Sequence, residues 1–219
     1  MEVMQRMDKE KEHAKLNEKL WDLRAETFCD RRFSYFRSMQ KRVVSLLDLK
    51  ENQRLLDLGC GTGWAVCYAA SLVNDRGEFY GIDISSKMIA KAKANSSAYK
   101  DVHFYQTAAD QLPFENDFFD FIICSNSFHH YFNPDKVLLE VYRVLKPKGR
   151  LYIPDVTADG FIMRMVDKLA KKREQEHVKF YSTQEYRTLF AKAGVDYVAS
   201  KLVTFPVKIH IGEKPHHQN

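Results

Sequence analysis

Residues 55–63 read Leu55-Leu56-Asp57-Leu58-Gly59-Cys60-Gly61-Thr62-Gly63, and this stretch decides the fold. A short apolar run ends in three alternate glycines. Glycines let the backbone turn sharply, and they let a ligand approach main-chain atoms that a Cβ atom would block. A helical pattern of Ala, Val and Tyr follows over residues 64–73. The stretch therefore predicts a strand, a ligand-binding turn and a helix.

The spacing of these glycines differs from that of dinucleotide-binding proteins. Their G-x-G-x-x-G pattern would need a glycine at position 64, where this chain has Trp64. A bulky residue there is hard to reconcile with a pyrophosphate bound at the helix N-terminus. The turn therefore favours a nucleoside without phosphates and argues against a nicotinamide-dependent oxidoreductase.

Asp83 stands twenty residues after Gly63 and closes the next predicted strand. A carboxylate at this point can accept hydrogen bonds from both hydroxyl groups of a ribose. The alternative is that it stabilises the N-terminus of the helix that Ser85 or Ser86 caps. The combination of the glycine turn with an acid at this spacing favours ribose binding.

Strand-like and helical runs alternate through the rest of the chain, as in βαβ units around a parallel sheet. The predicted strands span residues 54–58, 78–82, 102–106, 118–124, 150–153, 197–203 and 207–211. The predicted helices of this part span residues 64–73, 85–94, 134–145, 160–174 and 183–193. These elements predict a doubly wound, Rossmann-like α/β domain over residues 51–219. Its sheet has seven strands, the last of which is antiparallel, with Pro206 in the final hairpin turn.

Residues 1–50 are predicted to form two helices that act as an N-terminal lid. The chain of 219 residues is 45% hydrophobic and 29% charged, as in ordinary globular domains. It has no run of about 18 apolar residues that could span a membrane, and its charged N-terminus is unlike a secretory signal. We therefore expect a cytoplasmic protein.

The composition also limits which ligands and partners are expected. The four cysteines lack the spacing of a metal site, so no metal is expected. The net charge of +5 is spread along the chain rather than gathered in one basic block, so nucleic acid is not expected as a partner. The sequence does not indicate an oligomeric state.

Three segments carry a resemblance to a known family: LLDLGCGTG at residues 55–63, FYGIDIS at residues 79–85, and the run from Ala108 to Asp155. Residues 52–155 as a whole resemble the class I S-adenosylmethionine-dependent methyltransferases. The similarity is greatest to the small-molecule branch that includes the ubiquinone and menaquinone methyltransferases. The resemblance implies S-adenosyl-L-methionine as the cofactor and a small molecule as the methyl acceptor.

The resemblance also implies which residues bind the cofactor. They are Asp57, Gly59, Cys60, Gly61, Gly63, Asp83, Ile84, Met88, Ala109, Asp110 and Ser125. Asp57 and the first two glycines of the turn would line the methionine end. Asp83 would hold the ribose, and Ile84 and Met88 would pack near the adenine.

One position departs from the family pattern. The family has an acid or an amide for the adenine amino group where this chain has Ala108. Either Asp110 takes over this role, or main-chain atoms around Ala109 are sufficient.

Two histidines follow the predicted strand 118–124, at the carboxyl edge where open α/β sheets bind ligands. His129 and His130 are candidates to remove a proton from the acceptor. The alternative is that one packs structurally and the other is solvated. Residues 125–128 contain no proline, which argues against the amino groups of adenine or cytosine as acceptors.

Five aromatic or histidine side chains are candidates for the acceptor pocket, with the hydrophobic core as their alternative location. Trp21, Phe28 and Tyr35 precede the glycine turn, where the family places a lid. His177 and Tyr181 precede the sixth strand, which is the other usual source of acceptor contacts.

The predicted function is methyl transfer from S-adenosylmethionine to a small organic acceptor by in-line displacement. Two alternatives remain open: a tRNA or protein side chain as the acceptor, or a protein that binds the cofactor without catalysis. The predicted helix 160–174 is apolar on one side and basic on the other. It either packs over the site or touches a membrane surface and admits a lipid acceptor.

Overall fold

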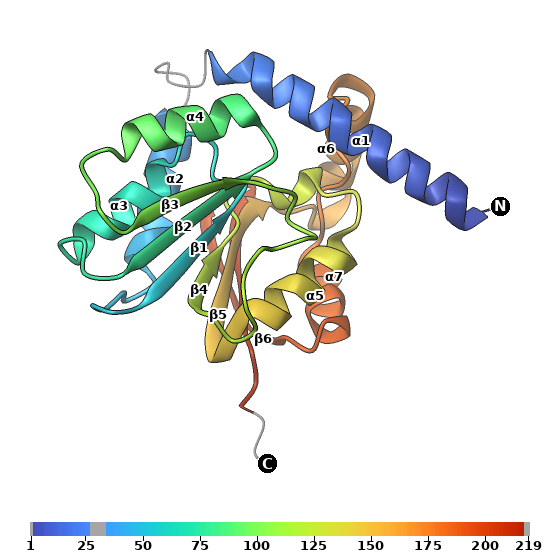
Figure 1. Cartoon of the computed structure of the whole chain (residues 1–219). Coiled ribbons are helices and arrows are strands. Elements are labelled where there is room, and N and C mark those ends of the chain that lie inside the picture. Colours follow the sequence, from blue (N-terminus) through green and yellow to red (C-terminus); the bar gives the residue numbers. More distant parts are fainter. Residues whose placement is uncertain (1, 27–33, 217–219) are drawn as a thin grey trace.

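A seven-stranded sheet with the order β3-β2-β1-β4-β5-β7-β6 forms the centre of the protein (Figure 1). The structure is a computed structural model that describes residues 2–26 and 34–216. The strands are β1 (Arg54–Leu58), β2 (Glu78–Asp83), β3 (Val102–Gln106), β4 (Phe119–Ile123), β5 (Leu145–Val156), β6 (Asp196–Thr204) and β7 (Val207–Glu213). Strands β1 to β5 pair in parallel, and β7 is antiparallel to both β5 and β6. The predicted doubly wound sheet with an antiparallel last strand is confirmed.

Helices cover both faces of this sheet. They are α1 (Glu2–Ala25), α2 (Ser34–Ser45), α3 (Trp64–Leu72), α4 (Ser86–Asn95), α5 (Pro134–Val144), α6 (Gly160–Arg173) and α7 (Thr183–Lys192), with a short 3-10 helix η2 at Phe128–His130. Apolar side chains of α2, α3 and α4 pack against one face. Side chains of α5 and α7 form the core on the other face. None of the helices in the described part of the chain combines the length and apolar character needed to cross a membrane.

Local sequence signals explain where several helices begin. The side chain of Ser85 accepts a hydrogen bond from the backbone N–H of Met88 and so caps α4. Asn133 caps α5 in the same way, with Pro134 at the first helical position. Ser182 forms a capping box at the start of α7. All three caps are residue types that are preferred at helix N-termini.

The main error in the predicted elements concerns β5, which runs from residue 145 to 156 and not only from 150 to 153. Its first part contains Lys146-Pro147-Lys148-Gly149, which has the composition of a turn. The backbone continues as a strand because Leu145 pairs with Phe119, and because the N–H of Lys148 donates to the carbonyl of Lys214. Tertiary pairing thus overrides the local turn signal.

Helix α1 lies across the carboxyl edge of the sheet (Figure 1). Near its C-terminal end, the Asp22 carboxylate accepts hydrogen bonds from the Ser85 hydroxyl at 2.5 Å and the Lys87 backbone N–H at 3.1 Å. Near its N-terminal end, Glu10 forms an ion pair with Lys136 of α5 at 3.1 Å. Because α4 and α5 belong to the two halves of the doubly wound sheet, α1 bridges both halves above the point where they meet.

A close approach at Gly81 of β2 gives a test of the packing. A Cβ atom there would lie 2.6 Å from the ring of Phe104 and 2.8 Å from the Sγ atom of Cys60, both of which are buried. Gly81→Ala should therefore lower the free energy of unfolding by about 1–3 kcal/mol, as overpacked cores do. Urea denaturation measures this change, with Lys93→Ala on the exposed side of α4 as the control. Equal stability of the two variants would contradict the described packing.

Candidate active site

A cavity of about 560 Å³ opens at the carboxyl edge of the sheet. Its walls come from the loop after β1, the ends of β2, β3 and β4, the helix η2 and one side of α1. The sheet order reverses between β1 and β4, and open α/β sheets bind their ligands at such a switch point. The volume is that of a small-molecule site.

The glycine loop forms the floor of this cavity. Gly59, Cys60 and Gly61 line the cavity, and all three glycines of the loop have positive φ angles. A Cβ atom on Gly59 would lie only 2.1 Å from the Ser127 hydroxyl, so the loop can approach the segment after β4 this closely only with glycine. Gly63 is not part of the wall, since it caps α3 and packs against Phe104.

Asp83 lies on the wall beside this loop. One of its carboxylate oxygens accepts from the backbone N–H of Gly61 and the other from that of Ser85, both at 2.9 Å. Each oxygen keeps a further lone pair, as the two hydroxyls of a ribose require. Burial raises the pKa of Asp83, although these hydrogen bonds act in the opposite direction. The contact with Ser85 also places Asp83 at the N-terminus of α4. The position of Asp83 is therefore compatible with both predicted roles, binding a ribose and stabilising the start of a helix.

Asp57 near the end of β1 is fully buried and lies two residues before the cavity floor. Neither of its carboxylate oxygens has a hydrogen-bond partner within the described part of the chain. Burial raises the pKa of Asp57 well above its usual range, and the negative charge of Asp83 raises it further. A buried carboxylate without partners costs free energy that a cation can offset. Asp57 does not itself line the cavity, but negative charge directly behind the glycine loop would favour a positively charged ligand at this end.

The far end of the cavity floor contains the predicted adenine contacts. Ile84, Met88, Ala109 and Asp110 all line the cavity. Ala108 lines it as well, at the position where the family has an acid or an amide. Asp110 and the main chain around Ala109, the two predicted replacements for the family's acid or amide at position 108, therefore both lie on the cavity wall.

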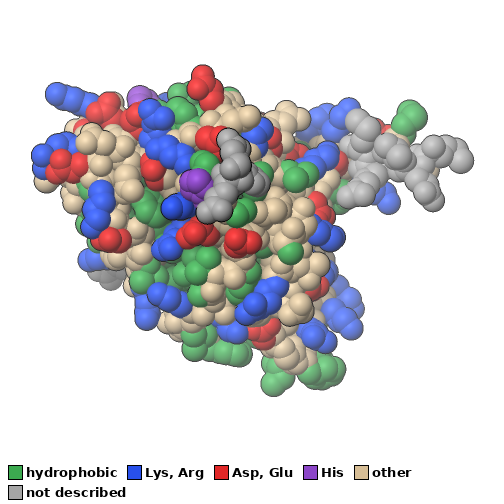
Figure 2. Space-filling view, turned by 90° about the horizontal axis from the view of Figure 1, so that it is seen from below, with side chains coloured by type: hydrophobic (Ala, Val, Ile, Leu, Met, Phe, Trp, Pro, Cys, Tyr) green, Lys and Arg blue, Asp and Glu red, His purple; other side chains and the backbone are tan. Residues whose placement is uncertain are grey.

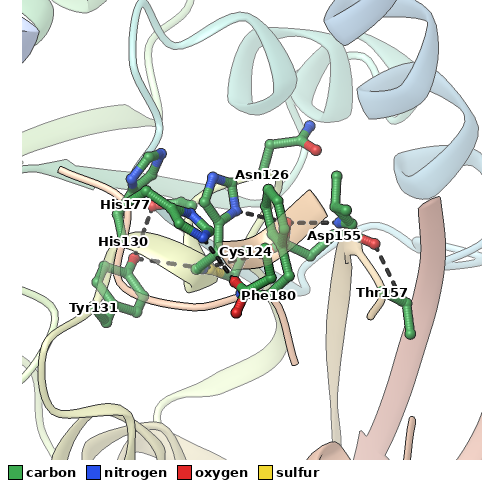
Figure 3. Close-up of polar contacts among 12 residues, drawn as sticks. Cys124, Asn126, His130, Tyr131, Asp155, Thr157, His177 and Phe180 are labelled. Carbon is green, nitrogen blue, oxygen red and sulfur yellow. Dashed lines mark hydrogen bonds and ion pairs between the residues drawn. The ribbon is translucent and has the colours of Figure 1, made fainter. Parts of the chain in front are cut away.

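His129 follows β4 and forms part of the wall, with Ser125 close by. Its Nδ1 atom lies 2.7 Å from a carboxylate oxygen of Asp155, and its backbone N–H donates to the other oxygen at 3.1 Å. Asp155 is fully buried near the end of β5 (Figure 3). Since a carboxylate only accepts hydrogen bonds, it holds the proton on Nδ1 and leaves Nε2 as an acceptor.

His130 also lines the cavity, but its surroundings differ. Its Nδ1 atom is 3.1 Å from the carbonyl oxygen of Glu176, and its ring meets the edge of Trp21 on α1. Its backbone carbonyl oxygen accepts a hydrogen bond from the Asn17 side chain. Burial lowers the pKa of His130 well below its usual range, and the neighbouring His129 lowers it further, so this imidazole is neutral.

The five residues predicted for the acceptor pocket are not brought together. Only Trp21 lines the cavity, and Phe28 lies outside the described residues. Tyr35 is exposed on α2. His177 is buried with its Nε2 atom 2.8 Å from an Asp167 oxygen, and burial lowers its pKa.

Tyr181 is a core residue. It packs against Phe128 and Tyr186 and is not part of the cavity wall. Tyr181 therefore belongs to the core and not to the acceptor pocket, because its ring fills space next to Phe128 of η2.

Several wall residues were missed in the sequence. The largest group lies on one side of α1: Glu10, His13, Ala14, Asn17, Trp21 and Arg24. Their spacing of three and four residues is the signal that could have found them, because such positions share one helical face. Asp155 was missed as the partner of His129, since nothing in its local sequence distinguishes it from other acids at strand ends.

Comparison with known proteins agrees with this geometry. A family model described as a methyltransferase domain matches residues 49–194. The chain is 29% identical over 170 residues to an uncharacterized methyltransferase, YcgJ, of Bacillus subtilis, a match that covers 76% of this chain and 66% of the relative. It is 29% identical over 207 residues to a demethylmenaquinone methyltransferase of Bacillus cereus, covering 84% and 87% of the two chains.

A solved structure shares the fold. The crystal structure of a SAM-dependent methyltransferase from Aquifex aeolicus superposes with a TM-score of 0.71 at 23% identity. The superposition covers 88% of this chain and 98% of that one.

These matches place the chain in the methyltransferase family, since the family model spans more than half of it. It is an S-adenosylmethionine-dependent methyltransferase, and S-adenosyl-L-methionine is its cofactor. The predicted enzyme class and cofactor are confirmed, and the nicotinamide-dependent alternative is not supported.

Removal of the Asp83 carboxylate should weaken cofactor binding. Asp83→Ala takes away the acceptor that we expect the ribose to use, and it takes away the one that holds the Gly61 N–H in place. We expect the Kd for S-adenosylhomocysteine to rise at least tenfold in calorimetric titrations, which is about 1.4 kcal/mol. Asp101→Ala, at an exposed position before β3, is the matched control. An unchanged affinity of the Asp83 variant would show that the ribose is held elsewhere.

The raised pKa of Asp57 has a consequence for stability. Because the folded-state pKa of Asp57 lies above its unfolded value, this group's contribution to stability is largest at low pH and is lost as pH rises through the folded-state pKa. Asp57→Asn removes this titration. Without ligand, its free energy of unfolding should fall less than that of the wild type between about pH 4 and pH 8. Parallel pH profiles from urea denaturation would contradict the assignment.

Proposed function

We propose that this enzyme transfers a methyl group from S-adenosylmethionine to a small organic acceptor, and that His129 removes the acceptor's proton. The observation that carries this proposal is the pair of His129 and Asp155. His129 stands on the cavity wall with Nδ1 held at 2.7 Å from a buried carboxylate. An imidazole fixed in this way keeps Nε2 free of the proton, and in the proposed reaction Nε2 would accept the proton of a molecule in the cavity. The acceptor is therefore a hydroxyl, an amine or an acidic carbon that loses a proton.

The cofactor supplies an electrophilic methyl group on a sulfonium. Asp83 would accept hydrogen bonds from the ribose, and the Gly59 and Gly61 backbone would let the methionine end approach closely. The unpartnered carboxylate of Asp57 would offset positive charge at that end. Ile84 and Met88 would pack near the adenine.

Within residues 1–50, which are predicted to form a lid, α1 is the helix that we propose covers the active site. Asn17 and Trp21 of this helix contact His130, and Arg24 forms an ion pair with the buried Glu176. These contacts position η2, which includes His129, while α1 covers the cavity. The helix would exclude water and align the two reactants, and alignment alone can contribute about 7–11 kcal/mol in favourable cases.

A small acceptor fits this site better than a macromolecule. The cavity of about 560 Å³ is bounded by α1 on its open side, so a folded tRNA or a protein loop would have to displace that helix. The relative from Bacillus cereus is named for a small-molecule acceptor, demethylmenaquinone. This name supports a quinol-like or phenolic hydroxyl, or the ring carbon beside it, as the class to test first.

An acceptor panel tests the proposal. Release of S-adenosylhomocysteine is measured with phenols and quinols, amines and thiols, and in parallel with total tRNA and with protein. Turnover with one class of small molecule is the expected result. Turnover with tRNA or protein alone, or tight cofactor binding with no turnover at all, would overturn it in favour of the macromolecular or the non-catalytic alternative.

The role of His129 has its own test. His129→Asn should lower kcat by about 10²–10⁴-fold, the usual contribution of a general base, while the affinity for S-adenosylhomocysteine stays within twofold. Asp155→Asn should lower kcat less, because it only disturbs the tautomer and orientation of the imidazole. His103→Asn on β3, outside the cavity wall, is the control. A His129 variant with unchanged kcat would exclude the proposed base.

A further inference from the structure

Helix α6 does not bury its apolar side. Phe161 is 77% exposed and Ile162 is 73% exposed, and Met165, Val166 and Leu169 are also exposed. Only Met163 and Asp167 of this helix are buried. The expectation that α6 packs its apolar side over the site is therefore wrong.

The exposed apolar residues of α6 form one continuous surface. They stand at positions i, i+1, i+4, i+5 and i+8 from Phe161, which share one face of a helix. Figure 2 shows exposed hydrophobic side chains grouped at the rim of the molecule with lysines and arginines beside them. Contiguous exposed apolar surface of this kind marks an interaction site.

The charges on the same helix are almost all positive. The exposed basic residues of α6 are Arg164, Lys168, Lys171, Lys172 and Arg173. The single acid of the helix, Asp167, faces the protein, where it accepts hydrogen bonds from His177 and from the backbone N–H of Phe180. The outer surface of α6 thus combines apolar side chains with positive charge. Within the described part of the chain, Lys171 is the one basic residue of this helix that forms an ion pair, with Asp167.

A second exposed aromatic residue lies beside the start of α6. Phe205, at the turn between β6 and β7, is 75% exposed. This turn is tied to the segment before α6 because the Thr157 N–H donates to the Pro206 carbonyl oxygen. Lys208 of β7 forms an ion pair at 2.6 Å with Asp159, which directly precedes the helix. The hairpin turn and α6 therefore present apolar side chains next to each other.

The same helix adjoins the cavity at both ends. Val156, four residues before α6, and Glu174, directly after it, both line the cavity. A molecule held against the outer surface of α6 is thus next to the segments that frame the proposed active site.

We propose that α6 binds the surface of a bilayer that contains anionic lipids, and that the methyl acceptor is lipid-soluble and enters the cavity from there. A helix with an apolar face and a lysine- and arginine-rich polar face lies in the plane of the headgroups, where anionic lipids complement its charge. Charge complementarity favours this occupant over a second copy of the chain, whose α6 would bring the same positive charge. The acceptor part rests on the proposed function, whereas bilayer binding stands independently of it.

Vesicle flotation of the full chain tests bilayer binding. We expect binding to vesicles of phosphatidylcholine with phosphatidylglycerol, and at least tenfold less binding to phosphatidylcholine alone or at high salt. The double variant F161E/I162E should lose at least tenfold in binding to the anionic vesicles. Leu139→Glu, at an exposed apolar position on α5, is the control and should bind as the wild type does.

Two further measurements, the cofactor affinity and the oligomeric state, distinguish the possible reasons for a negative result. The affinity for S-adenosylhomocysteine should be the same in F161E/I162E and in the wild type, because α6 is not part of the cofactor site. Failure to float with anionic vesicles, or flotation that F161E/I162E leaves unchanged, would overturn the proposal while leaving the proposed function intact. A wild-type dimer in solution that F161E/I162E converts to monomers would overturn it in favour of a contact between two copies.

Discussion

Two carboxylates at the carboxyl edge of the sheet, the fully buried Asp57 and the partly exposed Asp83, set the constraint that the rest of the site must satisfy. Asp57 has no hydrogen-bond partner for either oxygen, and the charge of Asp83 adds to the cost of ionising it. Burial and the nearby charge of Asp83 therefore favour the protonated carboxyl of Asp57 until a cation arrives. The sulfonium cofactor of this family carries such a charge. We infer that the free-energy cost of ionising Asp57 beside Asp83 is offset when a cationic ligand binds, and that this contributes to the affinity for the ligand.

The surrounding structure follows from that requirement. The glycine loop can take its place beside these acids only without a side chain at Gly59, since a Cβ atom there would meet Ser127. Helix α1 bridges both halves of the sheet above the cavity and holds η2 through the carbonyl of His130. His129, which precedes His130 in the same short helix, is held by the buried Asp155. We infer that a single rigid assembly presents the cofactor, the base and the covering helix together.

Much of this could be predicted because it depends on short-range patterns. The strands β1 and β3 were predicted with their observed bounds, since apolar runs between turn residues are local signals. The cavity also brings together most of the residues inferred for the cofactor. The extent of β5, the burial of Tyr181 and the outward apolar side of α6 could not be predicted, because each depends on distant segments. The wall residues of α1 were overlooked because their helix is dominated by charge.

Proton exchange on cofactor binding tests the central claim most directly. Calorimetric titration with S-adenosylmethionine in two buffers of different ionisation enthalpy gives the number of protons released. At about pH 6 the ligand's own amino group stays protonated, so any released proton comes from the protein. We expect net proton release that disappears in the Asp57→Asn variant, as an acid of raised pKa ionises against the incoming cation. Tight binding of the wild type without proton release would contradict the account.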